Sequence, residues 1–494
     1  MDAICINQAD NVEKSVQVSR MGRIFSNCSG LLIWLGDADN HDEKAFELMR
    51  QIGHDYASAN LAQYGELGAR VLNTSDTEAL GALSRARERA YWYRLWIVQE
   101  ITLSIPRPSC RQQQVLCGPF EIPFRHWSLA NLMLSMRNIE AVQRPRWEPL
   151  SDAGYRQAPS LESWHGVKVR EFTLASNLWE HRVQDCSDPR DRVYALLGVS
   201  SGVDKYGIVP NYELDIRQVL CKCAALFVQL DKDITFLGAC WTGWTIHQGL
   251  PSWVPHWYVS TTFRGQKYLV MGTQHGVDHR FRSGISQAAH AEVSADLRYL
   301  KLRCLLLGVV ATTETPWIEP AEALPSPVLH EVVRTWADSV TAHHARCFDT
   351  RISQLEAFIR TVLCNTSMEL ALLDDSHLAL FELWARNGGN VSSTQLTDSE
   401  EFSMGILEAD VEISITHRRF LILEGGYMAL GPADTEVGDV LAIPYGSQAP
   451  FVFRNAEDDS YTLIGACYVH GVMEGEAFEQ PLKGTFTTED LTII

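Results

Sequence analysis

The first 35 residues constrain the fold most, because they alternate between apolar runs and a helical pattern. Residues 2–6 are short and apolar, as at the carboxyl end of a strand, and Asp10 can cap a following helix with Glu13 three residues on. Apolar side chains then recur at helical spacing as far as Gly30, namely Val12, Val16, Met21, Ile24, Phe25 and Cys28. The continuous run LLIWLG predicts a strand buried on both faces. Strand, helix and strand in succession form a βαβ unit and predict a parallel sheet.

Helical patterns dominate the next part of the chain. Residues 41–105 are expected to be helical, ending in ALSRARERAYWYRLWIVQEITLS. In DPRDRVYALLGV, Asp188 can cap a helix that Gly198 ends, with proline at the first helical position. A further helix is expected over 213–230.

Strand patterns take over towards the end of the chain. YLKLRCLLLGVVA reads as strand, residues 326–386 as helix, and everything from Arg418 as β structure with a hairpin at Gly425-Gly426. We therefore expect an α/β parallel-sheet domain over 1–200, a mixed helical and strand region over 201–410, and an antiparallel β barrel or sandwich over 411–494.

Composition excludes several classes of partner. The formal net charge of −19 disfavours nucleic acid and anionic membranes, whose phosphates would be repelled. No apolar run approaches the ~20 residues of a membrane span. The 12 cysteines are scattered, which is typical of reduced thiols in a cytoplasmic protein. The glycine motifs that cradle nucleotides, the G-x-S-x-G elbow and H-E-x-x-H do not occur, so the sequence indicates no cofactor and no metal.

The loop after the first apolar run is the first candidate site. In parallel sheets, ligands bind beyond the carboxyl ends of strands. One strand is expected to lead into Asn7, Gln8 and Asp10, and the other into Asp37. A structural alternative is that Asn7 and Gln8 bond to the turn backbone while Asp10 caps the helix.

The helix YWYRLWIVQE is the second candidate site. On a helix, Trp96 would lie one turn from Gln99 and Glu100, with Trp92 one turn further back. An aromatic face beside a carboxylate could hold a ring and an acid of raised pKa. Alternatively, the tryptophans pack on the sheet and Glu100 pairs with a nearby arginine such as Arg94. In DPRDR, caps and surface pairs are the simplest interpretation, with one arginine tying that helix to the sheet.

Several segments together resemble the fungal heterokaryon-incompatibility (HET) domain family. They are DAICINQADNVEKSVQVSRMGRIFSNCSGLLIWLG, RLWIVQEI, DPRDRVYALLGV and LPSWVPHW, and the C-terminal GGYMALGPADTEVGDVLAIPYGSQAPFVFR and YTLIGACYVHGVMEGEA also fit. The resemblance implies an upstream segment that is missing here, so we expect a gene model that starts late or a member that has lost it. His256 stands where the family usually carries aspartate.

The resemblance also implies a fold and a function. The fold would be distantly similar to the flavodoxin-like TIR domains, and the role would be non-self recognition and programmed cell death when unlike fungal cells fuse. Some TIR relatives cleave NAD with a glutamate, so by analogy Glu100 is the candidate catalytic acid. The candidate ligand-binding residues are Cys5, Asn7, Gln8, Asp10, Asp37, Arg94, Trp96 and Gln99.

Three functional hypotheses remain open at this point. The chain is a signalling protein that acts by assembly with a protein partner, or an effector that cleaves a nucleotide with Glu100. As a third hypothesis, it is a cofactor-free enzyme of fungal secondary metabolism, such as a cyclase, that positions a small molecule. The sequence does not decide whether the chain is an enzyme.

Overall fold

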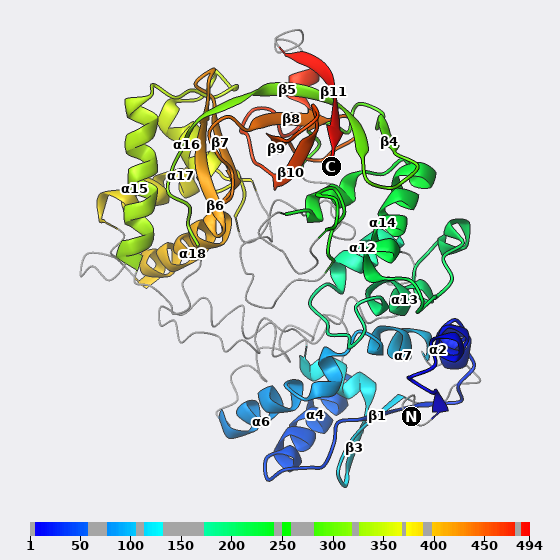
Figure 1. Cartoon of the computed structure of the whole chain (residues 1–494). Helices are drawn as coiled ribbons and strands as arrows, with labels where there is room; N and C mark the ends of the chain where they lie inside the picture. The colour runs from blue at the N-terminus through cyan, green and yellow to red at the C-terminus, as the bar shows by residue number, and fades with distance from the viewer. Residues whose placement is uncertain are drawn as a thin grey trace. The chain divides into compact units, whose positions relative to one another are not determined.

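The computed structural model describes most of the chain (Figure 1). The described residues are 5–57, 77–104, 113–131, 172–241, 249–257, 281–318, 326–367, 372–388, 398–479 and 486–494. They divide into two compact units. Unit 1 comprises residues 1–219 with 257–261, and unit 2 comprises 220–256 with 262–494.

Unit 1 begins with two short helices, α2 (Asn11–Val18) and α3 (Met21–Ser26). The predicted cap is present, because the Asp10 carboxylate accepts hydrogen bonds from the amides of Val12 and Glu13. The strand expected over 2–6 is not seen: residues 1–4 lie outside the described residues, and the next two positions are not in a strand. Of the apolar side chains that recur at helical spacing, Val12, Val16 and Ile24 are largely exposed.

A three-stranded sheet follows, in the order β1-β2-β3. Strand β1 (Leu31–Trp34) pairs in parallel with β2 (Gln113–Cys117), which pairs antiparallel with β3 (Phe120–Pro123). Helices α4 (Asp42–Ala57) and α6 (Thr77–Arg87) pack on one face through a shared apolar core. The expectation that β1 is buried on both faces is wrong, because Leu32 and Trp34 are 72% and 52% exposed and only the other face is covered by these helices.

The helix expected up to residue 105 is interrupted. A 3₁₀ turn, η2 (Ala90–Tyr93), is followed by extended backbone at Arg94 before α7 (Ile97–Leu103) begins. The reason is a contact distant in sequence: the Asp185 amide donates to the Tyr93 carbonyl at 2.6 Å, and the Leu95 amide donates to the Asp185 carbonyl at 2.8 Å. These backbone groups therefore cannot make helical bonds, and the expected stacking of turns from residue 92 to residue 96 does not occur.

Three further elements lie wholly within unit 1. They are α12 (Leu174–Glu180), α13 (Asp191–Leu197) and η3 (Val203–Tyr206). Helix α13 lies in the expected segment DPRDRVYALLG and has Gly198 as its C-cap. The expected start is wrong, because the helix begins at Asp191 after Arg190 as N-cap, so Asp188 is not the cap and the proline is not its first residue. The expected helix over 213–230 is present as α14 (Ile216–Leu226), which continues into the π-helical turn η4 (Phe227–Asp231) and is followed by η5 (Thr235–Ala239).

Unit 2 is built on an eight-stranded, mainly antiparallel sheet that runs β11-β10-β9-β8-β5-β6-β7, with β4 beside β5 (Figure 1). The strands are β4 (Ala291–Val293), β5 (Leu300–Thr313), β6 (Arg418–Leu423), β7 (Met428–Pro432), β8 (Val440–Pro444), β9 (Phe451–Asn455), β10 (Tyr461–Ala466) and β11 (Thr487–Ile493). The expected hairpin at Gly425-Gly426 joins β6 to β7. Strand β11 pairs along its length with β5 but meets β10 at one residue pair, so the β-rich region is not a closed barrel.

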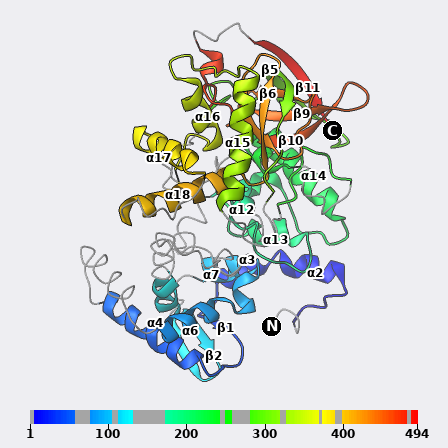
Figure 2. The same cartoon turned by 90° about the vertical axis from the view of Figure 1, so that its left-hand side faces the viewer.

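Helices lie against one end of this sheet (Figure 2). They are α15 (Ser326–Ala342), α16 (Gln354–Val362), α17 (Asp375–Arg386) and α18 (Asp398–Ile415), and a short 3₁₀ turn η7 (Glu476–Phe478) precedes β11. The buried Trp336 of α15 stacks on Phe420 of β6, which also meets Phe358 of α16. In the part of the chain that the structure describes, no helix is long and apolar enough to cross a membrane.

Candidate functional site

The loop before α2 makes local contacts. Asn7 is exposed, and its side-chain oxygen accepts from the Ala9 amide at 3.2 Å, while its own amide donates to Glu13 at 3.2 Å. Gln8 and Cys5 are also exposed. The Glu13 carboxylate accepts its hydrogen bond from the amide of Asn7 and not from the amide of Asp10, so the capping box is incomplete. The alternative interpretation of this loop, a turn bonded to its own backbone followed by a helix cap, therefore describes the contacts of Asn7 and Asp10.

Asp37 lies after β1 and has an exposed side chain. Its carbonyl accepts a hydrogen bond from Arg89 at 3.1 Å, and Arg89 also forms an ion pair with the buried Asp42 at the start of α4. The Cys117 thiol donates to the same Asp42 carboxylate at 3.4 Å. Burial, followed by this acidic neighbour, raises the pKa of Cys117 to about 12, so the thiol is protonated at neutral pH.

Glu100 lies on α7 with a side chain that is 14% exposed. The Tyr91 hydroxyl donates to its carboxylate at 2.9 Å, and Arg94 approaches the other carboxylate oxygen at 3.8 Å. Burial, reinforced by Glu100, raises the pKa of Tyr91 well above its usual value. The pairing with an arginine is the one that the sequence offered as the structural alternative for Glu100.

Trp96 joins a polar cluster around Asp191 that the sequence did not reveal. The Trp96 indole donates to the Asp191 carboxylate at 2.9 Å, and the Tyr212 hydroxyl donates to its other oxygen. Asp191 is buried, and burial raises its pKa although both hydrogen bonds oppose that shift. The caps-and-surface-pairs interpretation of DPRDR is therefore wrong for this residue.

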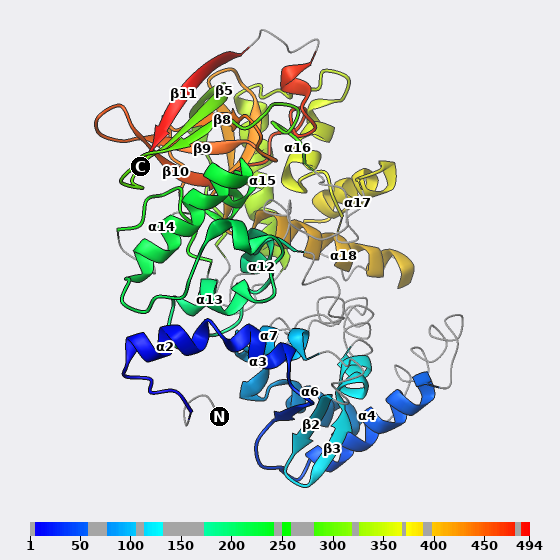
Figure 3. The same ribbon diagram turned by 90° about the vertical axis from the view of Figure 1, so that its right-hand side faces the viewer.

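The same cluster extends to α2, and α2, α7 and α13 lie together in Figures 1 and 3. Lys14 donates to Asp188 at 3.0 Å and lies over the Tyr212 ring at 3.9 Å. Arg190 pairs with Asp188 at 2.8 Å and donates to the carbonyls of residues 212 and 214. Burial raises the pKa of Asp188, but the hydrogen bonds from Arg190 and Lys14 outweigh it, so the pKa lies below its usual value. We call Lys14, Trp96, Asp188, Arg190, Asp191 and Tyr212 the Asp191 cluster.

Gln99 fills the space between three elements. Its amide nitrogen donates to the Ala195 carbonyl at 2.8 Å, and the side chain is buried. A Cβ atom at Gly198 would lie 2.9 Å from the Gln99 side-chain oxygen, and one at Gly22 would lie 3.7 Å from it. Gln99 therefore packs α7 against α13 rather than facing solvent, because glycine at position 198 leaves room for its side chain, whereas the distance at Gly22 of α3 is an ordinary van der Waals contact.

The structure thus brings some of the predicted residues together and leaves others apart. Gln99 and Glu100 lie on α7, Trp96 is its N-cap residue, and Arg94 reaches Glu100. Asn7 and Asp10 instead make the local contacts described above. Sequence reasoning missed Lys14, Asp188, Asp191 and Tyr212 as one cluster. The feature of the sequence that could have indicated this cluster is the four charged residues in DPRDR, because a helix cap uses only one of them.

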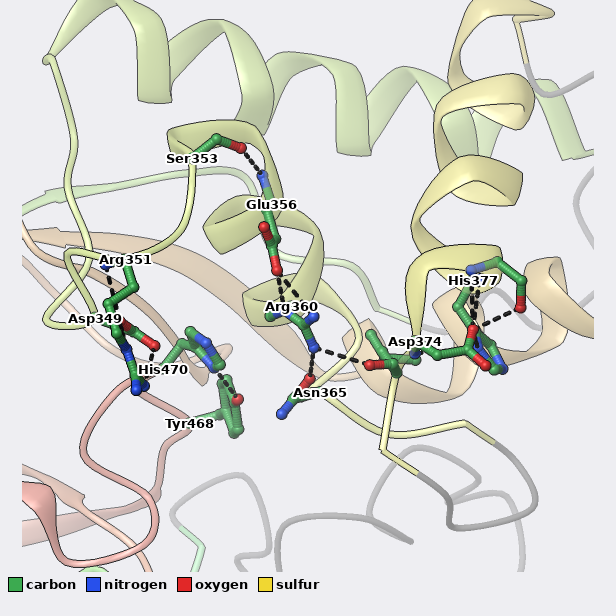
Figure 4. A network of polar contacts seen from close by, with 12 residues as sticks. Asp349, Arg351, Ser353, Glu356, Arg360, Asn365, Asp374, His377, Tyr468 and His470 are labelled. Carbon is green, nitrogen blue, oxygen red and sulfur yellow. Dashed lines mark hydrogen bonds and ion pairs between the residues drawn. The ribbon is translucent and has the colours of Figure 1, made fainter.

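Unit 2 contains a separate polar network (Figure 4). Arg360 donates to Glu356 at 2.9 Å, to Asn365 at 2.5 Å and to the Leu373 carbonyl at 3.0 Å. The Tyr468 hydroxyl lies 2.8 Å from the His470 ring nitrogen. These contacts join loops to α16 and to the chain after β10, which is a structural role. Among the described residues, no group of three or more acidic, histidine or cysteine side chains could hold a metal ion.

Comparison with known proteins now identifies the relatives. The heterokaryon incompatibility protein (HET) family model matches residues 1–100, and the Het-6 beta-barrel domain model matches residues 398–487. The chain is 23% identical over a 585-residue alignment to "Heterokaryon incompatibility protein 6, OR allele" of Neurospora crassa, covering all of this chain and 82% of that protein. The chain is therefore similar to heterokaryon-incompatibility proteins, through a HET domain match at one end and a Het-6 barrel match at the other. The HET match takes in α2, β1 and α7 as far as Glu100, and the Het-6 barrel match runs from α18 to the start of β11. No solved structure matches the chain.

Proposed function

We propose that this chain is an effector of fungal non-self recognition that triggers cell death when unlike cells fuse. The observation that carries the proposal is the similarity along the whole chain to a protein named for heterokaryon incompatibility. The matches to a HET domain and a Het-6 barrel domain at opposite ends support the same role. The effector would act in the cytoplasm through a protein partner.

The domain organisation expected from the sequence is part of the proposal. Residues 1–200 would form a TIR-like HET domain, 201–410 a mixed region and 411–494 an antiparallel β region. The parallel pairing of β1 with β2 supports the first of these, since TIR-like folds are built on parallel strands. The antiparallel pairs from β6 to β10 support the last.

The runner-up function is cleavage of a nucleotide such as NAD, with Glu100 as the acid. This function is supported by the position of Glu100, a carboxylate on α7 beside Trp96 and Gln99. Against it, Glu100 already has Tyr91 and Arg94 as partners at 2.9 and 3.8 Å. In this second proposal, Trp96 and the loop at Cys5, Asn7, Gln8, Asp10 and Asp37 would bind the ligand. No observation specifically favours a cofactor-free enzyme.

One experiment separates these functions. The chain and its Glu100→Gln variant are purified, incubated with NAD, and followed for release of nicotinamide. The effector proposal, which involves no chemistry of its own, predicts no release by either protein. Release by the parent that disappears in the variant would replace it with the nucleotide-cleaving function.

A matched control guards against a folding defect. Glu121→Gln, in β3, changes an exposed carboxylate in the same way and should behave like the parent. If Glu121→Gln lost activity together with Glu100→Gln, the loss would indicate damage to the folded protein and not a catalytic role of Glu100.

A further inference from the structure

Helix α2 exposes apolar side chains to solvent, unlike a helix that packs on a hydrophobic core. None of its residues is buried, and its apolar side chains Val12 and Val16 are 62% and 43% exposed. Val18 is only partly buried, and the side chains that hydrogen-bond to distant parts of unit 1 include Lys14 and Ser15, both polar. Burial of apolar area, which usually fixes a surface helix, therefore contributes little to holding α2 in place.

Two adjacent residues make the contacts that hold the helix. The Lys14 ammonium pairs with Asp188 at 3.0 Å, where the two side chains are only 14% and 15% exposed, and it also lies 3.9 Å from the centre of the Tyr212 ring. The Tyr212 amide donates to the Ser15 hydroxyl at 3.0 Å. Lys14 thus occupies a site made of a carboxylate and an aromatic face, which is the chemistry that binds a primary ammonium.

The length of α2 links its docking to its folding. The helix has 8 residues, and isolated helices shorter than about 12–15 residues are marginal in water. Loss of the Lys14–Asp188 pair would therefore favour unfolding of the helix. Asp188 keeps a partner in Arg190, so the rest of the Asp191 cluster does not depend on α2.

We propose that α2 is a detachable helix, docked by the Lys14 ammonium in the Asp188–Tyr212 site, and that unit 1 therefore has a docked and an undocked state. Undocking takes the loop at residues 7–10 away with the helix and leaves the Asp188–Tyr212 site open to an ammonium group from elsewhere, such as a lysine side chain of a partner. This device goes beyond the proposed effector function and does not require it.

Hydrogen exchange on the full chain tests the proposal. In Lys14→Met, which keeps the length of the side chain but removes the charge, amides in residues 11–18 should exchange at least tenfold faster than in the parent. Amides in α7 and α13 should keep their protection. Lys14→Arg, which keeps the cation, should retain most of the protection of α2.

Lys44→Met is the matched control, because Lys44 pairs with Glu78 between α4 and α6 far from α2 in sequence. It should leave exchange in residues 11–18 unchanged. Should Lys14→Met fail to fold, the unaltered chain is measured at low and high salt, where screening of the ion pair should speed exchange in α2 alone. Unchanged protection of α2 in Lys14→Met and in high salt would overturn the proposal, and so would loss of protection in α2, α7 and α13 together.

Discussion

The indole of Trp96 donates a hydrogen bond of 2.9 Å to the carboxylate of Asp191, a residue 95 positions away in sequence. This bond ties the start of α7, inside the segment that the HET model matches, to the start of α13 outside it. Because Asp191 is buried, its carboxylate depends on its donors, and losing one leaves a charged oxygen without compensation.

Trp96→Phe tests the contribution of that bond. The variant keeps an aromatic ring but removes the indole N–H, so we expect the free energy of unfolding to fall by about 1–3 kcal/mol. Urea unfolding followed by circular dichroism measures the change. Trp34→Phe is the control, since Trp34 is half exposed on β1 and should change stability by less than about 0.5 kcal/mol. Equal effects of the two variants would mean that the Asp191 bond contributes nothing.

Gly198→Ala tests the close packing around Gln99. The added Cβ would lie 2.9 Å from the buried Gln99 oxygen, so we expect a loss of about 1–3 kcal/mol in the free energy of unfolding. Combining it with Gln99→Ala should cost less than the sum of the two single changes, because the clash is then gone.

Gly405→Ala is the control for Gly198→Ala, because it adds the same methyl group at a position with free space. Gly405 lies in α18 and an added Cβ there has nothing within 4 Å, so the change should stabilise the protein by about 0.5–1 kcal/mol. A Gly198→Ala variant as stable as Gly405→Ala would show that α7 and α13 are not packed as tightly as described.

The sequence predicted local features well and distant contacts poorly. The hairpin at Gly425-Gly426 and the helix that Gly198 ends depend on neighbouring residues, and both are present. The break at Arg94 was missed because its cause is backbone pairing with Asp185. For the candidate site, the position of Trp96 and Glu100 on or beside one helix could be predicted, but the burial of Asp191 could not, since its donors come from other elements.

Stability should depend on pH through His181. Burial lowers the pKa of this buried histidine to about 4 although a hydrogen bond with Gln184 opposes the shift, whereas the unfolded chain has a pKa near 6.5. Between these values the unfolded state binds the extra proton, so stability is full above about pH 6.5 and falls as the pH drops towards 4. Between pH 7.5 and 5, this residue should account for about 2 kcal/mol of lost stability.

His181→Gln isolates that contribution. The variant cannot take up the proton, so the difference in unfolding free energy between pH 7.5 and 5 should be smaller than in the parent by about the same 2 kcal/mol. Urea titrations of both proteins at the two pH values provide the comparison. A parent and variant with the same pH dependence would contradict the assignment of a buried, neutral His181.

The most direct test of the effector function is the fraction of hyphal cells that take up a vital dye after the chain is expressed from an inducible promoter in a filamentous fungus. Protein levels are matched by immunoblot, and Trp34→Phe serves as a folded control. We predict widespread dye uptake with the parent and with Trp34→Phe, and a reduced fraction with Trp96→Phe, which weakens the Asp191 cluster. Normal growth without dye uptake, while folded protein accumulates to the same level, would contradict the account.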